Sequence, residues 1–462
     1  MPQRKAAIIM TQRQEQLARL VDAGRERILE AERWLWEHPQ TGFTEWEAEG
    51  WLEEQYRALG YTLVTAGDIP GFYTDIDTGR PGPTLCILGE LDALEMPNHP
   101  QAIHGMAHAC GHHAQGAALL GVAMALKQSG ALEGLSGRIR LMMTPAEELI
   151  QLPFREELRK KGVIHALTGK VELMHRGFFD GVDLAFMVHG TSEGEEHWFS
   201  GIGGYNGCIA KIIRYKGRAA HAGGAPERGI NAQYAAMLGL QACNDLRETF
   251  QEKDAIRFHP IMTGVTSAVN IIPAEMKLES FVRGRTLDGI IRENKKINRA
   301  LAGGALALGA GVELTDRPGY APECHDSAFL ALTQQVCTDL AGPERTAFYP
   351  QMWSTGSSDF GDVTTVMPGV QFYAAGAVGS PHGDDYLPAD PVRLCVNSAK
   401  AQVLLADALL REKAAAAWDI VKNYQPRFSS ISEYFREMDK LILDKDAVTY
   451  DSDGSARIDY QN

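Results

Sequence analysis

The sequence lacks the features that would place it in a secreted or membrane class. Its seven cysteines are scattered and include no CxxC pair, which argues against a disulfide scaffold and favours a reducing compartment. No apolar run approaches the ~20 residues that a membrane-spanning helix needs. Polar residues resume by position 12, so the N-terminus does not have the pattern of a signal peptide. We therefore expect a cytoplasmic protein.

Positive charge is also scarce. Lys and Arg number 45 against 59 Asp and Glu, which gives a net charge of −14 with His neutral. Such a surface repels phosphate backbones, so the composition argues against a nucleic-acid-binding protein. In other respects the composition is that of an ordinary globular protein, and 462 residues are enough for two or three domains.

Helical and strand-like segments alternate in the first part of the chain. Apolar residues recur with helical spacing over 12–37 and 44–59, and three β-like runs follow within 61–88. A small-residue helix over 114–128 and a strand over 138–143 continue the alternation. This order predicts an α/β fold in which helices cover both faces of a sheet, an α/β/α sandwich.

A second block, residues 205–318, has its own order of strands and helices. The order β-α-β-β-α-β is the ferredoxin-like arrangement, and the block interrupts two α/β halves. We therefore expect a catalytic domain built from 1–204 and 319–425, with 205–318 as an inserted domain. A charged tail, 426–462, is expected to add one helix over 432–443 before a polar, Asp-rich end that fits disorder.

Four candidate metal ligands crowd the segment HGMAHACGHHAQG, namely His108, Cys110, His112 and His113. Thiolate and imidazole are the preferred donors for zinc and related ions. Glycines in the same segment let a loop bend closely around an ion. The alternative is a surface loop that happens to be rich in histidine.

Two neighbouring carboxylates, Glu147 and Glu148, follow a predicted strand and a proline in MMTPAEE. Adjacent residues of a strand point to opposite faces, so one carboxylate could turn to a metal and the other to a substrate or water. The alternative is a solvated turn.

Eight motifs occur in order along the chain, and together they decide between these alternatives. They are GELDAL (Glu90, Asp92), HACGHH, TPAEE, VHG (His189), GRAAHAGGAPERGIN (His221), VNIIPAE (Asn270), SSDFGDV and SPHGDDY (His382). In this order they resemble the co-catalytic metallopeptidase family of aminoacylases and glutamate carboxypeptidases. The similarity is greatest to its amidohydrolase subfamily, which includes auxin-conjugate, hippurate and aminobenzoyl-glutamate hydrolases. The resemblance covers roughly residues 15–410.

The resemblance implies a site with two divalent metal ions per subunit, Zn²⁺ or Mn²⁺, with Co²⁺ possible. It implies that Cys110 bridges the ions, that His112 and Glu148 bind one of them, and that His189 and His382 bind the other. It also implies that Glu147 is the general base and that Asp92, which is not itself a ligand, orients the imidazole of a ligand histidine. His113 stands where the family usually has Asp or Asn, and an extra imidazole there could change the charge of the pocket or compete as a ligand.

The implied reaction is hydrolysis of the amide bond of an N-acyl or N-aroyl amino acid, aminobenzoyl-glutamate-like or a related conjugate. A metal-bridging hydroxide attacks, with Glu147 as the base. The resemblance also implies that the inserted domain is a lid that pairs two protomers. In that homodimer His221 reaches the neighbouring subunit's metals and donates to the oxyanion. Whether a paralogous subunit is needed stays open.

Two further residues of the inserted domain are candidate contacts to a small-molecule substrate that carries a carboxylate. They are Asn270 and Arg283, and the planar fork of an arginine fits a carboxylate, although Arg285 is an equal competitor. Other functions stay open on the same scaffold, namely a dipeptidase, an aryl-amine hydrolase or a non-catalytic binding subunit. An intact Glu147 argues against the last of these, since a binding protein needs no base.

Overall fold

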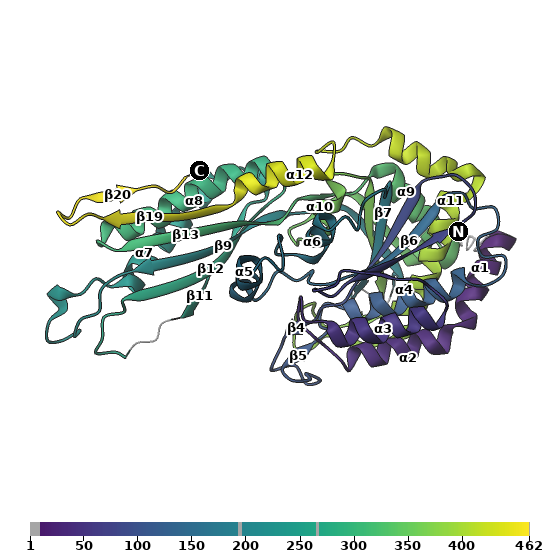
Figure 1. Cartoon of the computed structure of the whole chain (residues 1–462), viewed down its shortest axis with the longest axis horizontal. Coiled ribbons are helices and arrows are strands. Elements are labelled where there is room, and N and C mark those ends of the chain that lie inside the picture. Colours follow the sequence, from purple (N-terminus) through teal and green to yellow (C-terminus); the bar gives the residue numbers. More distant parts are fainter. Residues whose placement is uncertain (1–9, 193–195, 265–267, 462) are drawn as a thin grey trace, which may run out of the picture. The chain divides into compact units, whose positions relative to one another are not determined.

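The protein forms two compact units in the computed structural model, which describes residues 10–192, 196–264 and 268–461. Unit 1 comprises Met1–Gly204, Cys324–Trp353 and Asp362–Ile431. Unit 2 comprises Tyr205–Glu323, Ser354–Gly361 and Ser432–Asn462. Each contains a sheet with helices packed on it, so the prediction of a two-domain α/β protein is confirmed (Figure 1).

The sheet of unit 1 has the strand order β1-β2-β6-β3-β7-β16-β8-β14, with β15 also paired to β8. Its centre is parallel: β3 (Thr84–Glu90) lies between β6 (Arg138–Thr144) and β7 (Leu184–Thr191), and β16 (Gly369–Ala375) follows β7. The outer strands are β1 (Val64–Thr65), β2 (Phe72–Asp77), β8 (Phe199–Tyr205), β14 (Glu323–Cys324) and β15 (Thr346–Ser354). The carboxyl ends of the four central strands therefore meet at one edge, where ligands bind in open α/β sheets.

Helices cover this sheet. They include α1 (Gln12–Ala23), α2 (Arg25–Trp36), α3 (Trp46–Ala58), α4 (His112–Leu126), α9 (Ser327–Ala341) and α11 (Ser398–Asn423). Helix α4 is apolar all round and buried along nearly its whole length, because it packs on both β3 and α2. The segment 12–37, expected as one helix, is two. Gly24 ends the first of them by donating its N–H to the carbonyl of Val21.

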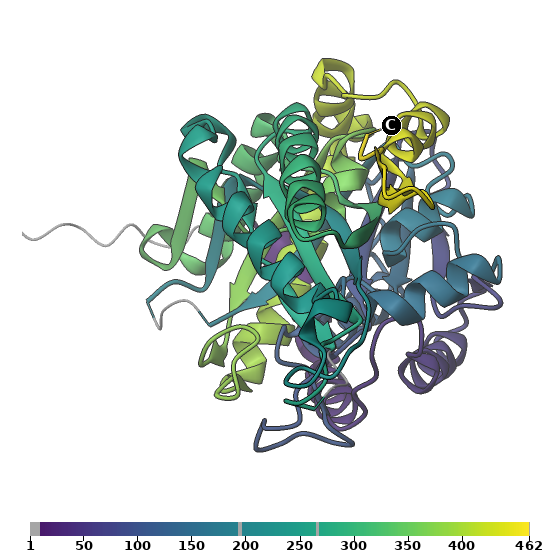
Figure 2. The ribbon, with the colours of Figure 1, turned by 90° about the vertical axis from the view of Figure 1, so that its left-hand side faces the viewer.

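Unit 2 is built on the order β10-β12-β9-β13-β19-β20, with β11 also paired to β12. The first strands are β9 (Gly207–Lys216), β10 (Arg257–Phe258), β11 (Ile261–Gly264), β12 (Glu275–Gly284) and β13 (Gly311–Tyr320). Alternate residues of β12, such as Met276, Leu278 and Val282, are buried on one face of this antiparallel sheet. Helices α7 (Ala232–Asp245) and α8 (Leu287–Ala307) lie side by side and share the core with that face (Figures 1 and 2).

The C-terminal segment corrects the expectation of a separate, disordered tail. After α12 (Ile431–Met438), strand β19 (Leu443–Tyr450) pairs antiparallel with β13, and β20 (Ala456–Ile458) pairs with β19. Apolar residues of β19 are buried in the core of unit 2. Its acidic residues Asp444 and Asp446 form ion pairs with Arg317 on the adjacent strand β13 (2.8 Å) and with Lys216 on β9, the next strand beyond it (2.7 Å). The dense charge of this segment reflects cross-strand pairing rather than disorder.

None of the described helices is long and apolar enough to cross a membrane. All seven cysteines are free.

Candidate metal centre

The candidate ligands of unit 1 gather at the carboxyl edge of its sheet. Glu147 and Glu148 follow β6, and His189 belongs to the end of β7. His382 lies in the loop between β17 (Ala377–Val378) and β18 (Leu387–Pro388), which follow β16. Cys110 directly precedes α4, where Gly111 adopts φ 94°. A side chain at Gly111 would lie 2.5 Å from the Tyr386 hydroxyl, so the tight turn that presents Cys110 requires glycine.

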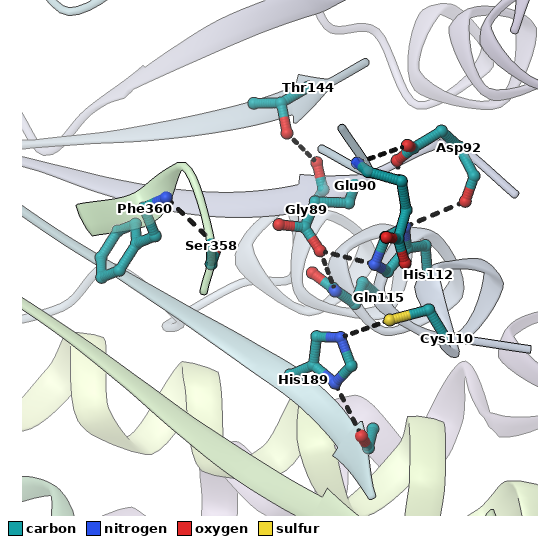
Figure 3. Close-up of polar contacts among 12 residues, drawn as sticks. Gly89, Glu90, Asp92, Cys110, His112, Gln115, Thr144, His189, Ser358 and Phe360 are labelled. Atoms are coloured by element: carbon teal, nitrogen blue, oxygen red, sulfur yellow. Dashed lines mark hydrogen bonds and ion pairs between the residues drawn. The ribbon is translucent and has the colours of Figure 1, made fainter. Parts of the chain in front are cut away.

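Three sets of donor atoms lie together here, and in each set all the atoms are within 4.8 Å of one another. The sets are Cys110, His112 and His189; Cys110, Glu148 and His382; and His112, Glu147 and Glu148. Cys110 belongs to two of them, and its Sγ is 3.4 Å from His189 Nε2 (Figure 3). In the second set, His382 Nε2 is 3.0 Å from Glu148 Oε1. The structure therefore brings together all six residues that the resemblance assigns to the metals and the base. It corrects their pairing, however: around Cys110 it groups His112 with His189 and Glu148 with His382, because each pair of side chains meets on one side of the thiol.

Hydrogen bonds fix which nitrogen of each buried imidazole is available. Nδ1 of His112 lies 2.9 Å from the carbonyl oxygen of Asp92 and 3.0 Å from its Oδ1. Nδ1 of His189 lies 2.7 Å from the carbonyl oxygen of Gly190. Because these oxygens only accept, both rings carry the proton on Nδ1 and leave Nε2 for an ion, the arrangement typical of metal-binding histidines.

The electrostatics of the cluster favour charged ligands. Burial and the Glu148 carboxylate oppose the Cys110 thiolate, but His112 and His189 outweigh them and hold the pKa of Cys110 well below its usual value. Burial also opposes the charge on His382, yet its hydrogen bonds to Cys110 and Glu148 raise the pKa of His382 to about 11. The imidazoles therefore hold protons at positions that a cation would take, so metal binding would release protons.

The loop that carries the two glutamates is held from three sides. Asp92 Oδ2 accepts from the backbone N–H of Glu148 at 2.9 Å, and Glu45 Oε1 accepts from the N–H of Ala146 at 2.7 Å. Arg155, fully buried, donates to the carbonyl oxygens of Ala146 (3.3 Å), Leu167 (2.6 Å) and Glu148. These bonds hold Ala146 at φ 52° and direct both glutamate side chains into the site. We expected the two side chains to point to opposite faces, as they would on a regular strand.

Sequence analysis missed a buried acid beside the ligands. Glu90 ends β3, and its Oε2 lies 3.2 Å from His112 Nε2 and 2.5 Å from Gln115 Nε2 (Figure 3). Its other oxygen forms an ion pair with Lys170, which is fully buried at the start of α6 (Gly169–His175). A lysine in the sequence GKVELMH gives no signal of burial, so this pair was not predictable from the local pattern.

His113 does not join any of the three ligand sets. Its ring packs edge-on against Trp36, and its Nε2 lies 3.3 Å from Glu32 Oε1. Burial is the main reason that the pKa of His113 is lowered, which keeps the ring neutral despite the nearby glutamate. The residue therefore fills a buried space behind the ligands.

The donor set fits divalent metal ions. One thiol, three imidazoles and two carboxylates converge, and Nε2 of His112 is buried without a well-aligned hydrogen bond to any described residue. Thiolate and imidazole suit zinc, whereas carboxylates also admit Mn²⁺ and Co²⁺.

The other predicted residues, His221, Asn270 and Arg283, belong to unit 2. His221 Nδ1 accepts from the N–H groups of Gly223 (3.2 Å) and Gly224 (2.9 Å), and the adjacent Ala222 donates to the Asn270 carbonyl at 2.9 Å. His221 and Asn270 thus lie on loops that are bonded to each other. Arg283 lines a cavity of unit 2 that does not include Arg285.

Comparison with known proteins identifies the family. Residues 71–398 match Peptidase family M20/M25/M40. One of the subunits of the p-aminobenzoyl-glutamate hydrolase of Escherichia coli is 27% identical over 353 residues, 73% of this chain and 75% of the relative. The Xaa-Arg dipeptidase of Mus musculus is 25% identical over 401 residues, 80% of this chain and 82% of the relative.

A solved structure from Bacillus subtilis, described as a dinuclear metal binding peptidase of this family, shares the fold. It has a TM-score of 0.62 and 20% sequence identity, and the match covers 84% of this chain and 99% of that one. With most of the chain matched, the resemblance read from the eight motifs is confirmed: the protein belongs to Peptidase family M20/M25/M40 and is a metal-dependent hydrolase.

Proposed function

We propose that the protein hydrolyses the amide bond of an N-acyl or N-aroyl amino acid, using two divalent metal ions. The observation that carries this proposal is the position of Cys110, which belongs to two ligand sets at once and so suits a bridge between two ions. Glu147 shares the third set with His112 and Glu148, so a carboxylate stands beside the proposed ligands.

In this proposal His112 and His189 hold one ion with Cys110, and Glu148 and His382 hold the other with it. Zn²⁺ and Mn²⁺ are the favoured ions, and Co²⁺ also fits the donors. When bound, such a pair of ions polarises an amide carbonyl and lowers the pKa of a water molecule that attacks it.

Glu147 acts as the general base. It takes a proton from the attacking water as the new C–O bond forms, and it returns the proton to the nitrogen as the C–N bond breaks. The products are a carboxylic acid and an amino acid, and the residue ends in its starting state. Glu147 is nearly buried, at 7% exposure, so few competing water molecules reach it.

Unit 2 contributes the remaining groups of the proposed site. His221 donates to the oxyanion of a neighbouring subunit, and Asn270 and Arg283 contact the substrate's carboxylate, for which the guanidinium fork is suited. A homodimer through this inserted, lid-like domain is supported by the apolar side chains that α7 exposes, Tyr234 (60% exposed) and Met237 (50%). Strand β11 adds Ile261, which is 62% exposed.

The relatives suggest two kinds of substrate. The E. coli relative is named for an N-aroyl glutamate, and the mouse relative for a dipeptide that ends in arginine. We favour the N-acyl conjugate, because the amidohydrolase motifs of the sequence match that subfamily. Since all seven cysteines are free, we also propose that the enzyme works in the reducing cytoplasm.

Turnover of a substrate panel by metal-loaded protein tests the proposal. The panel contains N-acetyl and 4-aminobenzoyl amino acids, Xaa-Arg dipeptides and simple aryl amines, each with added Zn²⁺, Mn²⁺ or Co²⁺. We expect the N-acylated amino acids to be cleaved and Glu147→Gln to abolish their cleavage. Faster cleavage of dipeptides or aryl amines would mean that the protein is a dipeptidase or an aryl-amine hydrolase instead. No turnover by fully loaded protein would favour a binding subunit.

A further inference from the structure

A cavity of about 350 Å³ lies within unit 1, where helix α2 and the segment 378–391 both line it. Its volume is that of a small-molecule site. None of the six residues proposed for the metals and the base lines it, so it is a separate site. The same segment, 378–391, carries His382 in the loop between β17 and β18.

The buried side chain of Glu32 in this lining points to a positively charged ligand. Glu32 is 3% exposed, and no lysine or arginine of the described residues forms an ion pair with it. Its polar contact there is with His113, whose Nε2 is 3.3 Å from Glu32 Oε1 but has no well-aligned hydrogen bond. A buried carboxylate is costly unless a cation or hydrogen-bond donors compensate it. A cation in the cavity would supply this compensation.

The indole of Trp36, which also lines the cavity, is held in one orientation. Its Nε1 donates to Gln101 Oε1 at 2.8 Å. The ring packs edge-on against His113 and His99, with ring centres 4.8 and 6.0 Å away. An indole attracts a cation that lies over its face within about 6 Å of the ring centre. Trp36 therefore offers a second attraction for the same ligand, and it is oriented before the ligand binds.

The rest of the lining indicates what kind of cation fits. Glu37 and Arg33 are both exposed, so solvent screens their opposite charges, and Glu32 is the buried charge of this lining. A bare metal ion would need several buried oxygen or nitrogen ligands rather than one carboxylate. The segment 378–391 adds apolar side chains, namely Val378, Leu387, Pro388 and Pro391. Such a lining fits an organic cation with an apolar chain.

We propose that this cavity binds a small aliphatic amine in its protonated form. The ammonium group donates to the Glu32 carboxylate and lies over the indole of Trp36, and the alkyl chain contacts the segment 378–391. Because the ligand contacts both α2 and this segment, it also restricts the motion of the loop that carries His382. The inference does not depend on the proposed reaction.

Calorimetric titration of the metal-loaded protein with pentylammonium and with pentan-1-ol compares a cation with a neutral molecule of similar size. We expect the wild type to bind pentylammonium about 10-fold more tightly or better. Glu32→Gln should remove this preference. Glu26→Gln is the matched control and should keep it, because Glu26 is exposed on the same helix and does not line the cavity. Equal binding of the two probes by the wild type, or a preference that survives Glu32→Gln, would overturn the proposal.

A second variant leaves Glu32 in place. Ala389 lines the cavity and is exposed, so Ala389→Trp should fill the cavity without disturbing the core. We expect this variant to lose pentylammonium binding while its metal content, measured by mass spectrometry, and its Tm stay at the wild-type values. An amine that bound directly to a metal ion would still bind to Ala389→Trp, and that result would overturn the proposal.

Hydrogen exchange tests the effect on the loop. In the metal-loaded wild type and in Glu26→Gln, saturating pentylammonium should slow the exchange of residues 378–391 and leave strand β2 unchanged. In Ala389→Trp the amine should have no effect on either segment. Unchanged exchange of 378–391 in the saturated wild type would show that the ligand does not restrict this loop, and that part of the proposal would be wrong.

Discussion

Asp92 binds His112 through two of its oxygens, the carbonyl oxygen at 2.9 Å and Oδ1 at 3.0 Å from the same ring nitrogen. Its remaining oxygen, Oδ2, accepts from the backbone N–H of Glu148 at 2.9 Å. A single buried carboxylate therefore couples the start of helix α4 to the loop after β6, and so fixes two proposed ligands relative to each other.

This coupling predicts that Asp92→Asn weakens metal binding by about 10 to 100-fold, the usual effect of removing a hydrogen-bond partner behind a ligand. An amide has only one accepting oxygen, so it cannot accept from both the His112 ring and the Glu148 N–H. Competition with a chromophoric chelator measures the affinity. Asp77→Asn, an exposed change in the same sheet, is the control, and an unchanged affinity in Asp92→Asn would refute the coupling.

The two neighbouring glutamates are expected to give opposite phenotypes. Glu147→Gln should keep its metals and its substrate affinity but lose about 10² to 10⁴-fold in turnover, because a general base is missing. Glu148→Gln should instead release metal. Mass spectrometry of the native protein counts the ions, and steady-state kinetics gives the turnover. Exchanged phenotypes would mean that the base and the ligand have been assigned the wrong way round.

The sequence could predict that the proposed ligands gather at one edge, because they sit in short motifs at the ends of strands. Cys110 and His112 lie within three residues of each other, and the parallel order of β6, β3 and β7 brings Glu148 and His189 to the same edge. Apart from Asp92, the residues that hold the proposed ligands in place were not predicted. Arg155 donates to loop carbonyls, and such backbone bonds leave no sequence pattern. Lys170 and Glu90 are 80 residues apart, so only the fold shows that they pair.

The extent of unit 2 shows the same limit. The pattern of apolar and polar residues predicts its first six elements. Strand β19 was not predicted, because its charged residues look like those of a solvated segment. In the sequence, Asp444 and Asp446 look like residues of a solvated tail, because their ion-pair partners lie on strands that are far away in the sequence. Pairing with a strand far away in the sequence therefore makes this segment a β-strand, which its local composition does not predict.

Glu49 predicts a pH dependence of stability in unit 1. Burial raises the pKa of Glu49 from its usual value to about 7, against a hydrogen bond from the Gly71 N–H at 2.8 Å. The folded state thus keeps a proton that the unfolded chain releases near its ordinary pKa of about 4.3. The stabilisation is complete below that pH and is lost as the pH rises through 7.

Glu49→Gln, which mimics the protonated acid, is therefore expected to stabilise the protein at pH 8 and to have little effect at pH 4. Because solvent partly screens the charge of this carboxylate, we expect the free energy of unfolding to rise by about 1 kcal/mol, or Tm by roughly 2 to 4 °C. Thermal unfolding at both pH values measures it. Glu53→Gln on the same helix is the control, and an equal shift at both pH values would contradict the assignment.

The buried ion pair of Lys211 and Asp316 predicts a stability effect confined to unit 2. Lys211 Nζ also donates to Asn294 Oδ1 at 3.0 Å, and Asp316 accepts from the amides of Asn294 (2.8 Å) and Asn298 (3.0 Å). Lys211→Met leaves the aspartate charged without its cation and should cost about 3 to 5 kcal/mol. Hydrogen exchange should show faster opening of β9 and β13, with β3 and β6 unchanged. Lys211→Met combined with Asp316→Leu should recover part of the loss.

His221 offers the most direct test of the proposed dimer. His221→Ala should leave metal content and Tm unchanged, because the ring is exposed and its described bonds are to the N–H groups of its own loop. Turnover should fall about 10² to 10³-fold with the loss of one oxyanion donor.

Mixing this variant with Glu147→Gln tests whether His221 acts across the interface. In a heterodimer, one site would combine Glu147 from one chain with His221 from the other, so activity should return after subunit exchange. Native mass spectrometry follows the exchange, and complete exchange without recovery would mean that His221 acts within its own chain or has no catalytic role.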